Sequence, residues 1–149
     1  MPESDTLLNI DNIAANCIGL RVRMLNRLVT NLYDEGLRPF GLKVSQVNIL
    51  VATWKLGTAR PAEMCKALQM DVSTLSRNVD RMKARGWLET MPDPDGRAQP
   101  FKLTAQGRDV LEKILPVWRE IQDKAITLLG AETLDWLNRS VRQLSSQAK

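Results

Sequence analysis

The spacing of hydrophobic residues along this 149-residue chain changes its period in one place. Apolar side chains recur every three or four residues through most of the sequence, which is typical of amphipathic helices. Between residues 87 and 103 the pattern instead predicts two short strands around a turn. We therefore predict a mostly α-helical fold of six helices with an inserted β-hairpin.

Capping residues and glycine or proline stops set the expected helix bounds. Short polar side chains that accept a hydrogen bond from the first helical turn mark the starts. Glycines mark most of the ends. The predicted helices run from Asp11 to Glu35, from Ser45 to Gly57, from Pro61 to Leu68, from Asp71 to about Gly86, from Thr104 to about Leu129, and onward from Gly130.

The predicted hairpin pairs Trp87–Met91 with Gln99–Leu103. The connection between these strands is rich in proline, aspartate and glycine, which favour turns. Pro100 has no backbone N–H to donate, so we expect its strand at an edge of the sheet.

The composition is that of an ordinary globular protein, with 44% hydrophobic and 26% charged residues. A chain of this length can bury a sizeable core without disulfides. Four tryptophans, Trp54, Trp87, Trp118 and Trp136, lie on apolar faces and are expected in the core. The chain has no histidine, which excludes histidine general-base catalysis and histidine-ligated zinc. We predict that it is not an enzyme and uses no cofactor or metal.

The net charge and the N-terminal residues indicate which classes of partner, nucleic acid or membrane, the protein could bind. The net charge of +4 permits a polyanionic partner. The acidic start of the chain does not resemble a signal peptide, and no apolar run approaches the roughly 20 residues of a membrane span. We expect a cytoplasmic protein with no membrane partner.

The segment from Arg60 to Thr104 carries the functional signal. A short helix, a three-residue turn and a longer helix form a predicted helix-turn-helix, and the hairpin that follows makes it winged. A helix of this kind fits the DNA major groove, where base edges are distinguishable. Leu75, Val79 and Met82 are expected to point inward, which leaves a polar outer face.

Candidate DNA-binding residues lie on that outer face and at the hairpin tip. Ser73 and Thr74 lie in the first helical turn, where backbone N–H groups favour phosphate. Arg77 is the candidate for a bidentate guanine contact. Arg97 is expected to reach a minor groove, with Asp95 orienting its guanidinium. The full candidate set is Ser73, Thr74, Ser76, Arg77, Asn78, Arg81, Asp95 and Arg97.

Four short sequence motifs, taken in their order along the chain, resemble those of the MarR family of bacterial transcription regulators. They are the stretch Leu68–Met82, the exit Arg85-Gly86-Trp87-Leu88, the wing Asp95-Gly96-Arg97, and the helix entry Leu103-Thr104-Ala105-Gln106-Gly107. The resemblance covers essentially the whole chain. It implies that Ser73, Thr74, Ser76 and Arg77 occupy DNA-contacting positions, with Asp95 and Arg97 as the wing pair.

The resemblance also implies an intertwined homodimer that binds a palindromic operator on double-stranded DNA, most simply as a ligand-responsive repressor. In a single domain over residues 1–149, about 42–103 would form the DNA-binding lobe. About 10–36 and 104–147 would be dimerisation helices. A small aromatic or phenolic effector would bind between the two parts.

Other interpretations stay open at this stage. Cys17 lies early in the first helix, where some members of this family sense oxidants, so a thiol-based redox switch is the alternative function. Its position on the apolar stripe favours simple packing, and the one tyrosine of the chain, Tyr33, lies four turns further along. A winged helix can also bind protein, and a polar helix face can be merely solvated. Asp93 and Asp95 lack the further ligands that a metal site needs.

Overall fold

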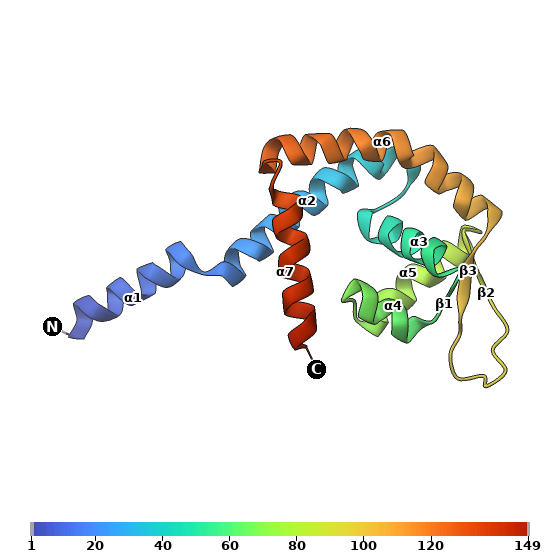
Figure 1. Cartoon of the computed structure of the whole chain (residues 1–149), viewed down its shortest axis with the longest axis horizontal. Helices are drawn as coiled ribbons and strands as arrows, with labels where there is room; N and C mark the ends of the chain where they lie inside the picture. Colours follow the sequence, from blue (N-terminus) through green and yellow to red (C-terminus); the bar gives the residue numbers. More distant parts are fainter. Residues whose placement is uncertain (1, 149) are drawn as a thin grey trace.

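The computed structural model describes residues 2–148 and confirms the predicted fold class, a mostly helical chain with a small antiparallel sheet (Figure 1). The elements are α1 (Pro2–Asn16), α2 (Ile18–Leu37), the 3-10 turn η1 (Arg38–Phe40), α3 (Val44–Leu56), β1 (Thr58–Ala59), α4 (Pro61–Leu68), α5 (Val72–Ala84), β2 (Leu88–Thr90), β3 (Phe101–Leu103), α6 (Ala105–Leu129) and α7 (Thr133–Gln147).

The first predicted helix is divided into two, which corrects the bounds expected from the sequence. Asp11 lies inside α1 and caps nothing, and the break falls at Cys17, whose backbone is extended (φ −66°, ψ 109°). Cys17 is still hydrogen-bonded to both helices, through its N–H to Ile13 O and through its carbonyl oxygen, which accepts from the Arg21 N–H. A one-residue break leaves the apolar spacing almost unchanged, so periodicity could not reveal it.

The start of α3 also differs from the prediction. Ser45 lies inside the helix, and Lys43 is the N-cap residue. The side chain of Gln46 accepts a hydrogen bond from the Lys43 N–H, and Asp34 Oδ1 in α2 accepts one from the Val44 N–H. The Gln46 contact is local, but the Asp34 carboxylate arrives from another helix, so the sequence around Ser45 does not by itself reveal this start.

The sheet has three strands in the order β1-β3-β2, all antiparallel. The expectation that Pro100 places its strand at an edge is wrong, because β1 was not predicted and pairs with the other side of β3. Pro100 stands just before β3, so its missing N–H interrupts no pairing. Its carbonyl oxygen accepts a hydrogen bond from the Met91 N–H at 2.7 Å.

The hydrophobic core lies where α3, α4, α5 and the sheet meet the ends of α2 and α6. Its largest fully buried side chains include Phe101, Leu50, Met64 and Met82. Helices α2 and α6 pack along each other above this lobe, and the Tyr33 hydroxyl of α2 donates a hydrogen bond to Gln122 Oε1 of α6 (Figure 1). None of the described helices combines the length and apolar character needed to cross a lipid bilayer.

The four tryptophans do not all lie in the core. Trp87 is buried and Trp118 is half-buried, but Trp54 and Trp136 are 60% and 53% exposed in the single chain. The prediction of four core tryptophans is therefore wrong for Trp54 and Trp136. Both lie on apolar helix faces that nothing in one chain covers.

Candidate nucleic-acid interface

The helix-turn-helix is formed by α4 and α5, as the sequence predicted. Arg60 precedes α4, and Pro61 opens it where its missing N–H costs nothing. The helix ends at Gln69, whose backbone is left-handed (φ 51°), and this reverses the chain toward α5. Leu75, Val79 and Met82 are buried, so the opposite face of α5 is turned outward.

Asp71 caps α5 with a bidentate contact to Thr74. One carboxylate oxygen accepts from the Thr74 N–H at 2.8 Å, and the other accepts from the Thr74 hydroxyl at 2.7 Å. These hydrogen bonds, with a smaller contribution from the charge of Arg77, lower the pKa of Asp71 below its ordinary value. The negative charge also complements the helix dipole.

The capping arrangement changes what two of the candidate residues can offer DNA. Thr74 is half-buried, and its N–H and hydroxyl are both engaged by Asp71. Asn78 is half-buried too, and its amide donates to the Thr74 carbonyl oxygen at 2.9 Å. Both side chains stabilise the helix in the free protein, so a contact to DNA would have to replace or share these hydrogen bonds.

The remaining candidates on α5 are Ser73, Ser76, Arg77 and Arg81, and all four are exposed. Arg77 and Arg81 lie one helical turn apart, so their guanidinium groups project from neighbouring positions on one side of the helix. The hydroxyls of Ser73 and Ser76 are short groups that allow close approach of a partner surface. Together they form a hydrogen-bonding face with two cations.

The wing is a long loop that extends from β2 and β3 (Figure 1). Asp95 and Arg97 are exposed near its tip, and within the described residues no hydrogen bond or ion pair joins them. The carboxylate that braces the loop is that of Asp93, whose Oδ2 accepts from the Ala98 N–H at 2.9 Å. The expected orientation of Arg97 by Asp95 is therefore absent in this structure.

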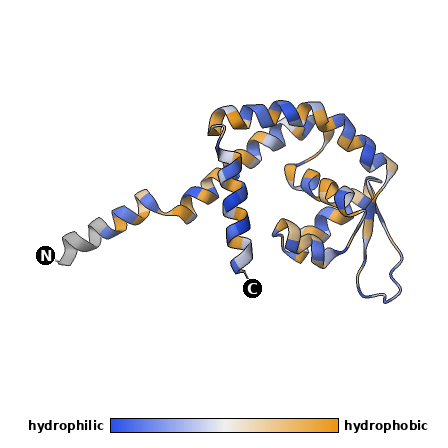
Figure 2. Cartoon of the chain, viewed as in Figure 1, coloured by the Kyte–Doolittle hydropathy of each residue, from blue (hydrophilic) through white to orange (hydrophobic). Residues whose placement is uncertain are grey.

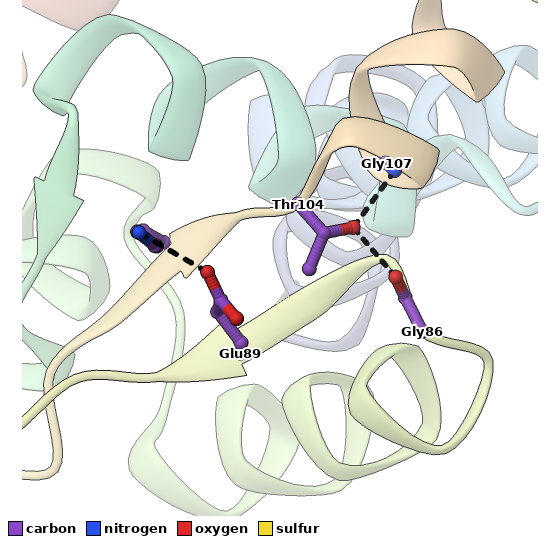
Figure 3. Close-up of polar contacts among 5 residues, drawn as sticks. Gly86, Glu89, Thr104 and Gly107 are labelled. Atoms are coloured by element: carbon purple, nitrogen blue, oxygen red, sulfur yellow. Dashed lines mark hydrogen bonds and ion pairs between the residues drawn. The ribbon is translucent and has the colours of Figure 1, made fainter.

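The base of the wing is fixed to α5 and α6 by Thr104 (Figure 3). Its hydroxyl donates to the Gly86 carbonyl oxygen at 2.5 Å and accepts from the Gly107 N–H at 3.0 Å. Alongside, Lys102 of β3 and Glu89 of β2 form a cross-strand ion pair at 3.2 Å. These contacts hold the two strands in register beside the exit of α5.

A groove of about 590 Å³ separates α5 from the wing. Three cations line it, Arg60 before α4, Lys83 of α5 and Arg97 of the wing, together with the carboxylates of Glu63 and Asp80. Sequence reasoning did not select Lys83, although it lies two turns beyond Ser76 on the same side of α5. Lys83 becomes a candidate only because the wing folds beside it and forms the groove. The periodicity of α5 gives no information about the position of the wing.

Cys17 lies away from this interface, at the break between α1 and α2, and is half-buried. Tyr33, the one tyrosine of the chain, is hydrogen-bonded to Gln122. Burial raises the pKa of the Tyr33 hydroxyl. Redox chemistry at Cys17 stays a prediction. Among the described residues, no three histidine, cysteine, aspartate or glutamate side chains gather as a metal site requires.

Comparison with known proteins agrees with the sequence and the fold. A family model described as MarR family matches residues 40–98. The multiple antibiotic resistance protein MarR of Salmonella typhimurium is 31% identical over 97 residues, which are 64% of this chain and 67% of that protein. The HTH-type transcriptional repressor NicR of Pseudomonas putida is 28% identical over 131 residues, covering 87% of this chain and 83% of NicR.

Solved structures give the same result. The transcriptional regulator MosR of Mycobacterium tuberculosis, crystallised in complex with DNA, superposes with a TM-score of 0.77 at 28% identity, over 89% of this chain and 96% of MosR. The chain therefore belongs to the MarR family of DNA-binding winged helix-turn-helix transcriptional regulators, which are not enzymes, as the residue composition predicted.

Proposed function

We propose that this chain represses transcription by binding a palindromic operator as a homodimer, with α5 in the major groove and the wing in the adjacent minor groove. The exposed face of α5 carries this proposal, because Ser73, Ser76, Arg77 and Arg81 present hydroxyls and guanidinium groups on the side of the molecule that also holds Arg97 of the wing. The description of NicR as a repressor and the DNA in the MosR crystal support it.

The proposed contacts divide into two kinds. Arg77 and Arg81 supply guanidinium forks for base edges and phosphates, and Ser73 and Ser76 supply hydroxyl donors. Arg97, with Asp95 near it, is assigned to the minor groove. Thr74 and Asn78 take part by exchanging a helix hydrogen bond for one to DNA.

The homodimer is supported by apolar side chains that one chain leaves uncovered. Figure 2 shows hydrophobic positions along α1, α2 and α7, which extend from the core. So many exposed large apolar side chains on three helices are unusual on a monomer and typical of a subunit interface. The exposed large apolar residues of α1, α2, α7 and the C-terminal end of α6 are Ile10, Ile13, Ile18, Leu20, Val22, Met24, Leu28, Leu128, Leu129, Leu134, Trp136, Val141 and Leu144.

In this dimer, residues of about 10–36 and 104–147 form the interface, and about 42–103 form the DNA-binding lobe. Two recognition helices would then meet successive major grooves about 34–36 Å apart. Sedimentation velocity at micromolar concentration tests the oligomeric state directly. A species with the mass of one chain would contradict the dimer.

An effector site is the second proposal, and an apolar pocket between α3 and α6 favours it. The pocket encloses about 390 Å³, which is in the range of small-molecule sites. Trp54, Trp118 and Val51 line it, and Arg108 stands at its rim, hydrogen-bonded to Glu112 at 3.1 Å. Two indole rings and a guanidinium suit a small aromatic or phenolic anion. Binding would favour a dimer with wrongly spaced recognition helices.

The testing experiment is a fluorescence-anisotropy titration against the DNA upstream of the protein's own gene and a scrambled duplex, at two salt concentrations. A preference of about 10³-fold for the upstream duplex is expected of a specific regulator. Equal and weak binding to both, with no salt dependence, would contradict the proposal and favour a protein partner.

The same complex serves for two further tests. Adding 2-hydroxybenzoate to the complex tests the effector site, with Trp54→Leu as its variant. Adding peroxide to wild type and Cys17→Ser tests the redox hypothesis.

A further inference from the structure

Arg85 directly follows α5 and makes two contacts that bind it to the body of the protein. Its guanidinium lies over the ring of the buried Trp87, 3.9 Å from the ring centroid. Its Nη1 donates a hydrogen bond of 2.6 Å to the carbonyl oxygen of Gly41. The planar guanidinium is suited to stacking on an aromatic ring while donating at its edge.

The segment that receives this hydrogen bond connects α2 to α3. Gly41 follows η1 with a left-handed backbone (φ 66°), and a Cβ there would lie 2.8 Å from Arg85 Nη1. The guanidinium therefore rests directly on the Gly41 backbone. Asp34 of α2 holds the next part of the segment through the Val44 N–H at 2.8 Å. The connection between α2 and α3 is thus fixed from α2 on one side and from α5 on the other.

The main packing partners of α5 are α4 and β2, whereas those of α2 are α6, α3 and η1. We propose that Arg85 is a positioning residue: it ties the recognition helix to α2 and so sets the separation of the two recognition helices in the dimer, without contacting phosphate. This inference rests on the DNA-binding homodimer proposed above.

The test compares a full operator with a duplex that holds a single half-site, each titrated at several salt concentrations. Arg85→Gln should weaken binding to the full operator about tenfold, because two misplaced helices no longer engage together. Its half-site affinity should change less than about twofold, because each reading face is intact. The salt slope on the half-site should be unchanged, whereas loss of a phosphate contact would reduce it by about 0.9.

Three further variants make the result specific. Arg85→Lys keeps the charge but not the planar fork, and should behave like Arg85→Gln. Gly41→Ala displaces the Arg85 guanidinium by a change outside α5, and should weaken binding to the full operator as Arg85→Gln does. The double variant should bind the full operator no more weakly than Arg85→Gln alone. Arg81→Gln, on the exposed face of α5, is the control: it should weaken binding to the half-site as well as to the full operator, where the contact is lost twice. Thermal melting of each variant checks that it is folded.

Retained operator affinity in Arg85→Gln would overturn the inference, and so would a reduced salt slope on the half-site or full rescue by Arg85→Lys. In each of these cases the wild type still binds its operator, so the proposed function stands. A folded wild type that binds neither duplex would overturn the proposed function and the inference with it.

Discussion

The Thr104 hydroxyl donates to the carbonyl oxygen of Gly86, 18 residues earlier in the chain, and accepts from the Gly107 N–H (Figure 3). One side chain thereby caps α6 and fixes the exit of α5. Thr104→Val should lower the free energy of unfolding by about 1–2 kcal/mol, the usual cost of a lost N-cap. Urea denaturation measures this. Thr104→Ser keeps the hydroxyl, and an equal loss in both variants would contradict the role of that group.

Gly107 is required by a close backbone approach. A Cβ at this position would lie 2.2 Å from the Trp87 carbonyl oxygen and 2.8 Å from Leu103 Cδ1. We expect Gly107→Ala to destabilise the fold by about 2 kcal/mol, because α6 must move away from the base of the wing. The matched control is Gly19→Ala in α2, where the nearest atom would be Cys17 Sγ at 3.8 Å. There the gain in helix propensity should stabilise the protein by about 0.5–1 kcal/mol. Equal effects at the two glycines in thermal denaturation would refute the argument.

The Asp71 cap makes part of the stability depend on pH. Hydrogen bonds from Thr74 lower the folded pKa of Asp71 below its ordinary value of 3.8. The ionised carboxylate therefore stabilises the folded state fully above the unfolded pKa, and this contribution is lost as pH falls through the folded pKa. The difference in unfolding free energy between wild type and Asp71→Asn should be constant near neutral pH and shrink in acid. Urea titrations from pH 7 to below pH 3 would show it, and Thr74→Ala should reduce the pH-dependent part.

Arg77 is expected to read sequence. Arg77→Ala should relax base preference in a selection from random duplexes, with a loss of about 1–3 kcal/mol of discrimination at one base pair. The physical reason is that a bidentate guanidinium distinguishes guanine in the major groove. A variant that selects the wild-type consensus with undiminished preference would show that another side chain reads that position.

Arg97 is expected to contribute affinity more than sequence preference. It lies on the exposed wing, so Arg97→Ala should weaken binding to matched and mismatched operators by similar factors and reduce the salt slope by about 0.9 per lost contact. Anisotropy titrations at several salt concentrations measure both quantities. An unchanged slope would mean that Arg97 does not contact the DNA backbone.

The local sequence was sufficient to predict the starts of those helices whose capping residues lie at the helix start itself. Asp71 and Thr104 cap α5 and α6 with their own side chains, and Pro61 opens α4, so short-range chemistry specifies these starts. The inward face of α5 was predictable because helical periodicity alone decides which side is apolar. The same periodicity turned Ser73, Ser76, Arg77 and Arg81 outward.

Only the tertiary structure decided features that depend on residues distant in sequence. The central place of β3 follows from β1, a two-residue strand too short to leave a pattern. The start of α3 depends on Asp34, and the position of α5 relative to α2 depends on Arg85 and Gly41. Periodicity reports which face a residue occupies, whereas contacts between elements are set by packing that local sequence does not encode. The hydrogen bonds of Thr74 and Asn78 are a separate case, because their partners lie within one helical turn and a helical wheel does not show them.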